Sequence, residues 1–504
     1  MFHSYLVKNL IKRYASINGV SKHTKSLLYA KKLDNSNANT HFISFSGAGT
    51  IDFVNGMVTT KLNEKFVKKN LTSLAVDDDD YEPPQMIKDL QNISMSNHVA
   101  KELIDEYNTN ASNMNDVDIR TRSLYDEQIE AYGNLKGQLT ALLSSQSKVT
   151  SLMRLYTPLN TQQENIIVEV PKQQLNEDEG EHDILAILEK HKRFKRNVKM
   201  INDVQNDNDL GFDVWDVCFE GKLERSDMEL ETLSFIIEDS KMNYLFNKKV
   251  HIDAHFKADN IIAVYFDDVL YNGSLLNDNS HRVYYKYKVL VKKETSESKD
   301  FIHSFYKEEL NEASIQEMKQ IEEKFGLFDL SDIVPGSTLP FDLNLDYVPN
   351  SVSFDKGCYI GQELTTRMYS TDKIVKRGVP VDIINSSNDI VPQVGWDVYT
   401  DDELKVKEGA SENVNNVFAN SNKAIKKRKK PVGKLIINND KTNVRLITLK
   451  SKYIDEIFVN ENKAMKFYLA PSKEEIKVKG LDVDKCKIDI KIKTPYWIHE
   501  YVEE

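Results

Sequence analysis

The pattern of apolar positions predicts strands and helices in alternation over the first 300 residues. Short apolar runs at 43–45, 166–170 and 261–266 are typical of strands, and 135–156 predicts two strands with a turn between them. Apolar residues at 184–188 fall on one face of a helix. Strands that alternate with helices in this way predict a layered α+β fold.

A different, β-type pattern follows after about residue 385. Apolar and charged residues alternate strictly over 485–493, which predicts a strand with one buried and one solvated face. Cys486 falls on the buried face, so packing explains it. We therefore expect a smaller, β-barrel-like domain over 386–504, interrupted by a polar insertion at about 401–430.

The first 33 residues have the composition of a targeting segment. They contain seven Lys or Arg residues but no Asp or Glu, and Phe2, Leu6 and Leu10 are spaced to share one face of a helix. A basic, acid-free amphipathic segment is typical of a mitochondrial transit peptide. We interpret 1–33 as the transit peptide and expect cleavage on import at or a little after Arg13, so that the mature chain begins between about Ala15 and Asp34. A basic N-terminus without a targeting role is the alternative.

Two further stretches have biased composition. Four consecutive Asp residues at 77–80 open an Asn- and Ser-rich segment, which predicts a disordered insertion at about 76–130 within a folded region that runs from about 40 to 385. The basic run at 426–430 has three interpretations, namely a nuclear signal, a nucleic-acid patch or a solvated loop. We favour the solvated loop because the same chain carries a predicted mitochondrial transit peptide at its N-terminus.

Bulk composition excludes several classes of protein. The 504 residues suffice for two or three domains, and the 40% hydrophobic content supports a sizeable core. A formal net charge of −11 argues against a nucleic-acid binder, which needs a basic surface. No apolar run reaches the roughly 18 residues that a membrane-spanning helix needs. We therefore expect neither a nucleic-acid nor a membrane partner.

Cysteine spacing leaves one candidate for chemistry. The chain has three cysteines, Cys218, Cys358 and Cys486. Because they are few, odd in number and far apart, they support neither a disulfide framework nor a zinc site. Cys358 alone lies between two glycines and just before a predicted helix at 362–369. The stretch reads Lys356-Gly357-Cys358-Tyr359-Ile360-Gly361-Gln362-Glu363.

This stretch favours a reactive thiol. Gly357 and Gly361 permit a tight turn, and a helix N-terminus together with Lys356 would stabilise a thiolate on Cys358. A thiolate can attack an electrophile or bind a soft metal such as iron. Glu363 and Arg367 stand four residues apart on the predicted helix and can pair. The spacing alone leaves open that Cys358 is a small buried residue beside a glycine turn.

The octapeptide resembles the signature Lys-Gly-Cys-Tyr-x-Gly-Gln-Glu of the YgfZ branch of the T-protein-like folate-binding family, and all seven specified positions match. Residues 339–346 and 53–59 are similar to two further family motifs, and 140–143 and 431–434 to two weaker ones. The resemblance implies a multi-domain folate-binding fold of the α+β class with a smaller C-terminal β-barrel. With the transit segment, it points to the mitochondrial branch, which assembles iron–sulfur clusters and is designated a mitochondrial transferase in yeasts.

What the resemblance implies about function centres on Cys358. It would be the functional thiolate and a transient ligand of an iron–sulfur cluster shared with an A-type carrier protein. The protein would act in the mitochondrial matrix, in the maturation of [4Fe–4S] enzymes such as aconitase and lipoate synthase.

The alternative function that the resemblance implies is a tetrahydrofolate-dependent one-carbon transferase, with the folate near Asn55, Asn344 and Asp346. Two departures from the family pattern weigh against transfer. Leu152 stands where the aminomethyltransferases carry an Asp, and Ser147 replaces a Gly. The segment 368–372 also lacks the usual His- and Gly-containing sequence. We therefore expect a non-catalytic assembly factor rather than an enzyme.

Overall fold

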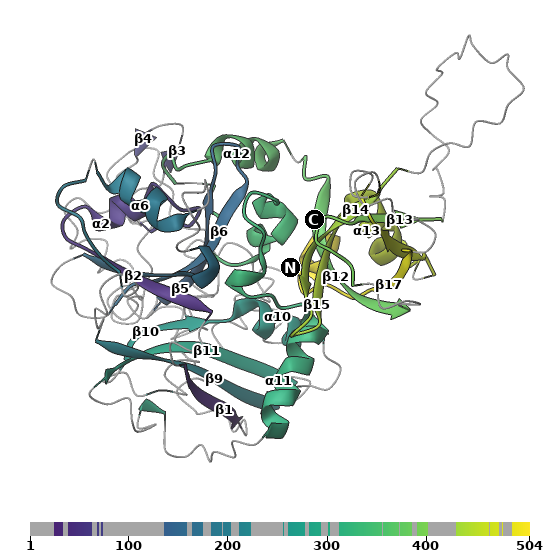
Figure 1. Ribbon diagram of the computed structural model, residues 1–504, viewed down its shortest axis with the longest axis horizontal. Coiled ribbons are helices and arrows are strands. Elements are labelled where there is room, and N and C mark those ends of the chain that lie inside the picture. Colours follow the sequence, from purple (N-terminus) through teal and green to yellow (C-terminus); the bar gives the residue numbers. More distant parts are fainter. Residues whose placement is uncertain are drawn as a thin grey trace, which may run out of the picture.

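In the computed structural model the chain forms a large curved sheet, with helices around it, and a separate small barrel (Figure 1). The structure describes residues 25–33, 39–62, 68–69, 72–73, 136–158, 164–174, 183–193, 195–202, 211–222, 256, 261–277, 282–293, 301–302, 312–354, 356–371, 373–385, 391–401, 430–462, 464–472, 476 and 486–503. The predicted insertions at 76–130 and 401–430 lie almost wholly outside these residues.

The large sheet has nine strands. Their spatial order is β1 (Lys25–Leu33), β9 (Phe212–Lys222), β11 (Arg282–Lys292), β10 (Ile261–Phe266), β5 (Lys136–Leu143), β6 (Val149–Tyr156), β7 (Asn165–Pro171), β2 (Thr40–Ser46) and β8 (Lys199–Asn202). Every neighbouring pair is antiparallel except β10 and β5, which are parallel and paired over two residues only. This seam divides the sheet into two halves.

A glycine permits the close approach at the seam. Gly137 on β5 pairs with Tyr265 on β10. A Cβ atom on Gly137 would lie 2.4 Å from the Cβ of Tyr265, a distance that real side chains do not tolerate. Glycine is therefore the residue that allows the two halves to join here.

The two halves of the sheet bend towards each other. Lys288 on β11 and Glu169 on β7 are four strands apart, which in a flat sheet is about 19 Å. Their charged atoms nevertheless lie 2.5 Å apart. The sheet must therefore curve sharply across the seam, and Figure 1 shows β2, β5 and β6 above β10, β11 and β9.

Helices pack on each half of the sheet. Against β2, β6 and β7 lie α2 (Thr50–Asn55) and α6 (Ile184–Lys192), which share one apolar core with these strands. The Asp183 side chain accepts hydrogen bonds from two main-chain N–H groups and so begins α6. On the other half lie α10 (Asp268–Asn277) and α11 (Glu312–Phe325), with Met318 and Phe325 of α11 packed against the sheet.

The C-terminal domain is a closed six-stranded barrel. Its strands, in order around the barrel, are β12 (Lys376–Asn385), β15 (Val444–Lys450), β14 (Gly433–Asn439), β13 (Asp397–Thr400), β16 (Phe467–Ala470) and β17 (Ile488–Ile492). Its apolar interior includes Cys486, which is 6% exposed, on the predicted buried face. The expectation of an α+β fold with a smaller C-terminal β-barrel is confirmed.

Shorter elements complete the described chain. Three 3-10 helices lead from α11 towards the barrel: η5 (Leu330–Asp332), η6 (Pro340–Leu343) and η7 (Leu345–Tyr347). Within and after the barrel strands lie α13 (Ser451–Ile454), the π-helix η8 (Asp455–Val459) and α15 (Ile498–Glu503). Elsewhere lie η1 (Lys172–Gln174) and a small hairpin of β3 (Lys68–Lys69) and β4 (Thr72–Ser73). In the described part of the chain, no helix combines the length and the apolar character needed to cross a membrane.

Two predicted boundaries need correction. Residues 25–33, assigned to the transit peptide, form β1, which pairs along its length with β9 and buries Leu27 and Leu28. The folded chain therefore begins by Lys25, before the predicted start at about residue 40. The barrel also begins earlier than residue 386, because β12 pairs with both β15 and β17.

Candidate functional site

Cys358 stands at the tip of a loop that is held from both sides. Gly357 and Cys358 are exposed, whereas Lys356 before them and Tyr359 after them are 5% and 6% exposed. The loop leads from the 3-10 segment to α12 (Gln362–Ser370), which Figure 1 places at the top of the molecule. The alternative that Cys358 is a buried packing residue is therefore wrong, while Cys218 and Cys486 are both buried.

The first anchor of this loop is the ammonium group of Lys356. It donates hydrogen bonds to three main-chain carbonyl oxygens, those of Asn55 at 2.5 Å, Val58 at 2.6 Å and Thr60 at 2.8 Å. Burial lowers the pKa of Lys356 to about 7. The three carbonyls favour the charged form, because only an ammonium has three N–H groups to donate.

These contacts give the Lys356 ammonium a structural role in the cysteine loop. The ammonium of Lys356 donates its three hydrogen bonds to carbonyl oxygens at and after the end of α2, and none of the three goes to Cys358. The predicted support of a thiolate by Lys356 therefore stays a prediction. Lys356 ties the cysteine loop to the predicted motif at 53–59.

The second anchor is Tyr359. Its ring lies 4.7 Å from the Lys356 nitrogen and packs in a cluster that includes Ala141, Leu143 and Leu345. Burial raises the pKa of Tyr359 to about 12, so the phenol stays neutral at physiological pH. Lys356 and Tyr359 together bury both ends of a short segment and leave Cys358 projecting between them.

A third contact fixes the start of α12. Gly361 adopts a left-handed conformation with φ of 77°, and a Cβ atom there would lie 2.4 Å from the main-chain oxygen of Ser144. The hydroxyl of Ser147, in the turn between β5 and β6, donates to the main-chain oxygen of Gly361 at 2.5 Å. Glycine is required here both for its conformation and for its size. Ser147, noted as a departure from the family pattern, thus makes a direct contact with the motif.

The helix that follows presents its motif residues to solvent. Glu363 and Arg367 pair across one turn at 2.8 Å, as predicted, but their side chains are 88% and 65% exposed. Such a pair contributes a few tenths of a kcal/mol at most. The side-chain oxygen of Gln362 accepts a hydrogen bond from the main-chain N–H of Tyr359 at 3.4 Å, which helps to close the loop.

The three residues predicted to hold folate are not gathered in one site. The side chain of Asn55 accepts from the main chain of Leu62, beside the cysteine loop. Asn344 exchanges two hydrogen bonds with the main chain of Gly378, at the start of the barrel. Nη1 of Arg377 donates to both carboxylate oxygens of Asp346, at 2.8 and 3.0 Å. Both side chains are almost fully buried. Asn344 and Asp346 therefore join the sheet domain to the barrel.

A cavity of about 50 Å³ lies between the sheet, the 3-10 segment and the barrel. Its walls are largely apolar, and its polar side chains include Arg154, Tyr265 and Asn344. Leu152, the residue that replaces the aminomethyltransferase Asp, also lines it. Asp267 is a carboxylate in the wall, and its oxygen already accepts from the main chain of Leu270 at the start of α10. The cavity thus lacks a free carboxylate near Leu152 among the described residues.

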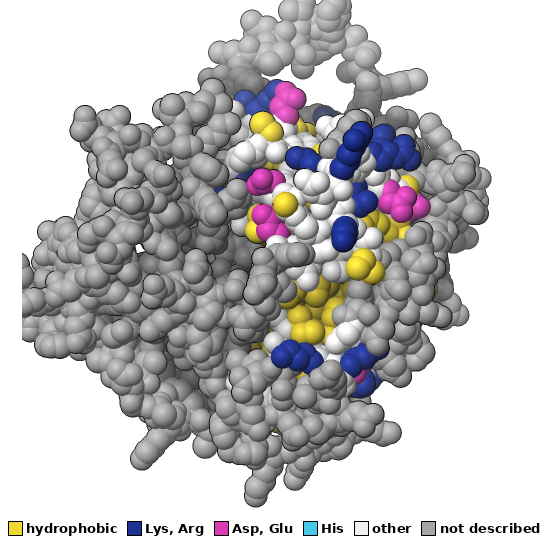
Figure 2. Space-filling view, turned by 90° about the vertical axis from the view of Figure 1, so that its left-hand side faces the viewer, with side chains coloured by type: hydrophobic (Ala, Val, Ile, Leu, Met, Phe, Trp, Pro, Cys, Tyr) yellow, Lys and Arg dark blue, Asp and Glu magenta, His cyan; other side chains and the backbone are white. Residues whose placement is uncertain are grey.

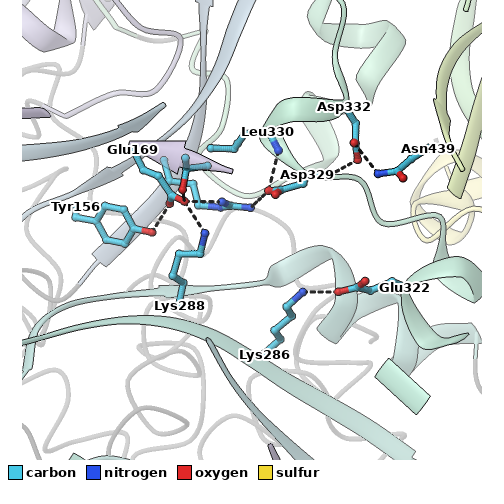
Figure 3. A network of polar contacts seen from close by, with 11 residues as sticks. Tyr156, Glu169, Lys286, Lys288, Glu322, Asp329, Leu330, Asp332 and Asn439 are labelled. Carbon is cyan, nitrogen blue, oxygen red and sulfur yellow. Dashed lines mark hydrogen bonds and ion pairs between the residues drawn. The ribbon is translucent and has the colours of Figure 1, made fainter. Parts of the chain in front are cut away.

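Beside this cavity lies a buried network of charges (Figure 3). Glu169 is fully buried and accepts from Tyr156 at 2.7 Å, Arg154 at 3.2 Å and Lys288 at 2.5 Å. Arg154 reaches on to Asp329 at 3.1 Å. The cations Lys288 and Arg154 hold the pKa of Glu169 below its usual value, against the opposing effect of burial.

The motif analysis did not find this network, although a signal was present. Arg154 and Glu169 are single charges inside otherwise apolar strands, which predicts a partner because an unpaired buried charge is costly. That partner is not identifiable from sequence, since Glu169 and Lys288 are 119 positions apart.

The candidate site contains one possible metal ligand. In the portion of the chain that the structure describes, no three His, Cys, Asp or Glu residues gather closely enough to hold an ion. Cys358 could supply a thiolate to a soft metal.

Comparisons with known proteins find relatives that match nearly the whole chain. No family model matches the chain. A mitochondrial iron–sulfur cluster assembly factor, the IBA57 homologue of Candida glabrata, is 27% identical over 92% of this chain and 90% of its own length. The homologue of Kluyveromyces lactis is 24% identical over 92% of each chain, and the Saccharomyces cerevisiae protein 26% identical over 92% and 88%.

The chain is thus similar over nearly its whole length to mitochondrial assembly factors named IBA57. Among solved structures, the glycine cleavage system aminomethyltransferase T from Bartonella henselae is similar, with a TM-score of 0.42 and 9% identity over 93% of this chain and 86% of that one. The similarity to the IBA57 proteins agrees with the predicted resemblance, and these relatives are named as mitochondrial.

Proposed function

We propose that this protein is a mitochondrial iron–sulfur cluster assembly factor in which Cys358 is the working residue. The observation that carries the proposal is the exposed thiol at the tip of a loop whose two ends are buried. Relatives that match nearly the whole chain are named as assembly factors of this kind. A rigidly supported, solvent-facing thiol is suited to a transient bond with iron held by a second protein.

The geometry supports a shared rather than a resident cluster. Cys358 has no further ligands of its own among the described residues, so a partner must supply the others. The finer proposal is that this partner is an A-type carrier protein in the mitochondrial matrix. The cluster is cargo that passes to [4Fe–4S] enzymes such as aconitase and lipoate synthase. The exposed residues Glu363 and Arg367, together with the half-buried Gln362, then border the contact.

A variant of Cys358 tests this proposal. The full chain and its Cys358→Ala variant are mixed anaerobically with an A-type carrier that holds a [2Fe–2S] cluster, and absorbance and Mössbauer spectra are recorded. We expect the wild type to form a mixed complex with an altered cluster spectrum and the variant to leave the carrier's spectrum unchanged. Cys486→Ala is the control. Equal spectra for wild type and Cys358→Ala would overturn the role of Cys358.

Folate-dependent transfer is not the function that these residues support. The predicted folate residues Asn55, Asn344 and Asp346 are engaged in separate structural contacts. The central cavity presents Leu152 where transfer needs a carboxylate, and Asp267 is committed to α10. The residues present do not fit tetrahydrofolate chemistry, and we derive no step through it.

A further inference from the structure

A strongly basic surface lies close to the cysteine loop. Within 189–199 there are six cationic side chains and a single carboxylate, in a chain whose formal net charge is −11. We call these six the basic ridge: Lys190, Lys192, Arg193, Lys195, Arg196 and Lys199. All are exposed except Lys192, which is half-buried. Figure 2 shows Lys and Arg side chains gathered on the upper part of the face that carries α2 and α6.

Structural roles account for only part of the ridge. Lys190 and Lys192 lie in the last turn of α6, where cations favour the helix. Lys199 begins β8, the last strand of the sheet, and charge on an edge strand discourages pairing with other chains. Arg193, Lys195 and Arg196 lie outside both elements. No ridge residue forms an ion pair with a residue that the structure describes.

The ridge and the cysteine loop are connected by one short helix. The main chains of Asn197 and Gly47 pack directly, because a Cβ atom on Gly47 would lie 2.2 Å from the Asn197 oxygen. Three residues later α2 begins, and its six residues are about 9 Å long. At its far end the oxygen of Gly56 accepts from the N–H of Ile360, two residues after Cys358.

That separation lies within a single protein interface. A standard interface buries about 800 Å² on each partner, which corresponds to a patch about 30 Å across. A protein seated over Cys358 would therefore also cover part of the ridge. Long-range attraction between a basic patch and an acidic one raises the rate of encounter and orients the partner.

We propose that the basic ridge is a docking surface for an acidic protein that exchanges a cluster at Cys358. This inference rests on the proposed function, because it is the cysteine that calls for a protein partner at this face. A nucleic-acid partner fits less well with a chain whose formal net charge is −11. A lipid surface leaves the adjacent cysteine unexplained.

Charge reversal at the ridge tests the proposal against a matched control. The ridge variant is Lys190→Glu/Lys195→Glu/Arg196→Glu. The control variant is Lys434→Glu/Lys441→Glu/Lys491→Glu, at exposed positions of the barrel. Each variant takes the formal net charge from −11 to −17, because three reversals each subtract two charges. The association rate with a purified, cluster-loaded A-type carrier is measured on the full chain by stopped flow at low and high salt.

We expect the ridge variant to associate about tenfold more slowly at low salt, and the difference to shrink at high salt. The control variant should change the rate far less. Equal rates in the two variants would overturn the inference. Binding of the ridge variant to vesicles containing cardiolipin and to an RNA oligonucleotide is measured as well. If charge reversal weakened only one of these interactions and left carrier association unchanged, the inference would be overturned and the ridge would be assigned to that ligand.

The result is separable from the test of Cys358. Cys358→Ala should keep the salt-dependent association and lose the spectral change of the cluster. If charge reversal at the ridge does not slow association while Cys358→Ala still abolishes the spectral change, the proposed function stands without this docking surface. Melting curves of both triple variants verify folding, and a Lys190→Gln/Lys195→Gln/Arg196→Gln variant, with half the charge change, should give an intermediate rate.

Discussion

At the scale of single residues, the site is an exposed thiol between two buried anchors. The motif pattern identified Cys358 as the candidate, because two glycines and a helix start surround it. The pattern could not reveal that Lys356 bonds to three carbonyls after α2, about 300 positions away along the chain. A lysine before a cysteine in sequence predicts an activating charge, whereas here its long side chain turns inward and acts as a structural support.

The two glycines of the motif should differ sharply in tolerance. Gly361→Ala places a methyl group 2.4 Å from the Ser144 oxygen in a left-handed conformation, whereas a Cβ on Gly357 meets nothing within 4 Å. The conformation alone costs about 1–2 kcal/mol, and the clash adds to it. Urea unfolding should show Gly361→Ala destabilised by at least about 2 kcal/mol and Gly357→Ala nearly unchanged. Similar stabilities would mean that the loop can shift away from the β5–β6 turn.

Accessibility should distinguish the three thiols. Cys358 is exposed, whereas Cys218 and Cys486 are 0% and 6% exposed, and burial raises the pKa of the Cys218 thiol. Iodoacetamide should therefore label Cys358 first in the native protein, as mass spectrometry of tryptic peptides would reveal. In denaturant all three should react alike. Labelling of Cys486 as fast as that of Cys358 in the native protein would contradict the barrel packing.

At the scale of elements, local patterns were sufficient for strands and helices with strong periodicity. Three predictions came close to the observed bounds: the two strands on either side of the turn at 144–148, the helix at 184–192 and the helix after Cys358. The strand β1 was not, because its three lysines and lack of acids match a targeting segment as well as a strand. What makes it a strand is its pairing with β9, about 190 positions later, which no local pattern contains.

Import should therefore remove less than the composition predicts. Cleavage after Leu33 would delete β1, unpair the edge of β9 and expose Leu27, Leu28 and Tyr29, which are all under 9% exposed. Burying such side chains is worth about 1.5–3 kcal/mol each. N-terminal sequencing of the protein from mitochondria should find a start between Arg13 and Lys25.

A truncation series checks the same point in vitro. A chain that starts at Ser21 should melt as a chain with the longer N-terminus does, whereas a chain that starts at Asp34 should lose several kcal/mol or aggregate through the open strand edge. Equal melting temperatures for the two truncated chains would show that β1 contributes little to the fold.

At the scale of the whole molecule, the buried charges hold the two halves of the sheet in register. Glu169 from one half accepts from Lys288 of the other, and Arg154 extends the contact to Asp329 beside the barrel-facing segment. A second buried pair, Asp346 with Arg377, joins that segment to the barrel. The sequence predicted both domains but not these links, because each depends on residues brought together only by the complete fold.

Glu169→Gln should weaken the molecule as a whole and change its response to acid. The substitution keeps the shape of the side chain but leaves Lys288 and Arg154 without their buried carboxylate, and breaking a buried pair in this way costs about 3–5 kcal/mol. Because those cations hold the pKa of Glu169 below its usual value, its favourable contribution is complete above about pH 4.5 and is lost as pH falls through the lower, folded-state pKa.

Urea unfolding at pH 7 and at about pH 3 measures both effects. Wild type should lose stability over this interval, and Glu169→Gln should start lower and lose less, because the variant has no carboxylate to protonate at this position. Glu363→Gln is the control, since Glu363 is 88% exposed and its pair with Arg367 is worth at most a few tenths of a kcal/mol. If Glu169→Gln matched wild type at pH 7, the network would be a consequence of the sheet's curvature rather than a support for it. Apolar contacts between the two halves, such as that of Phe42 on β2 with Phe212 on β9, would then hold them together.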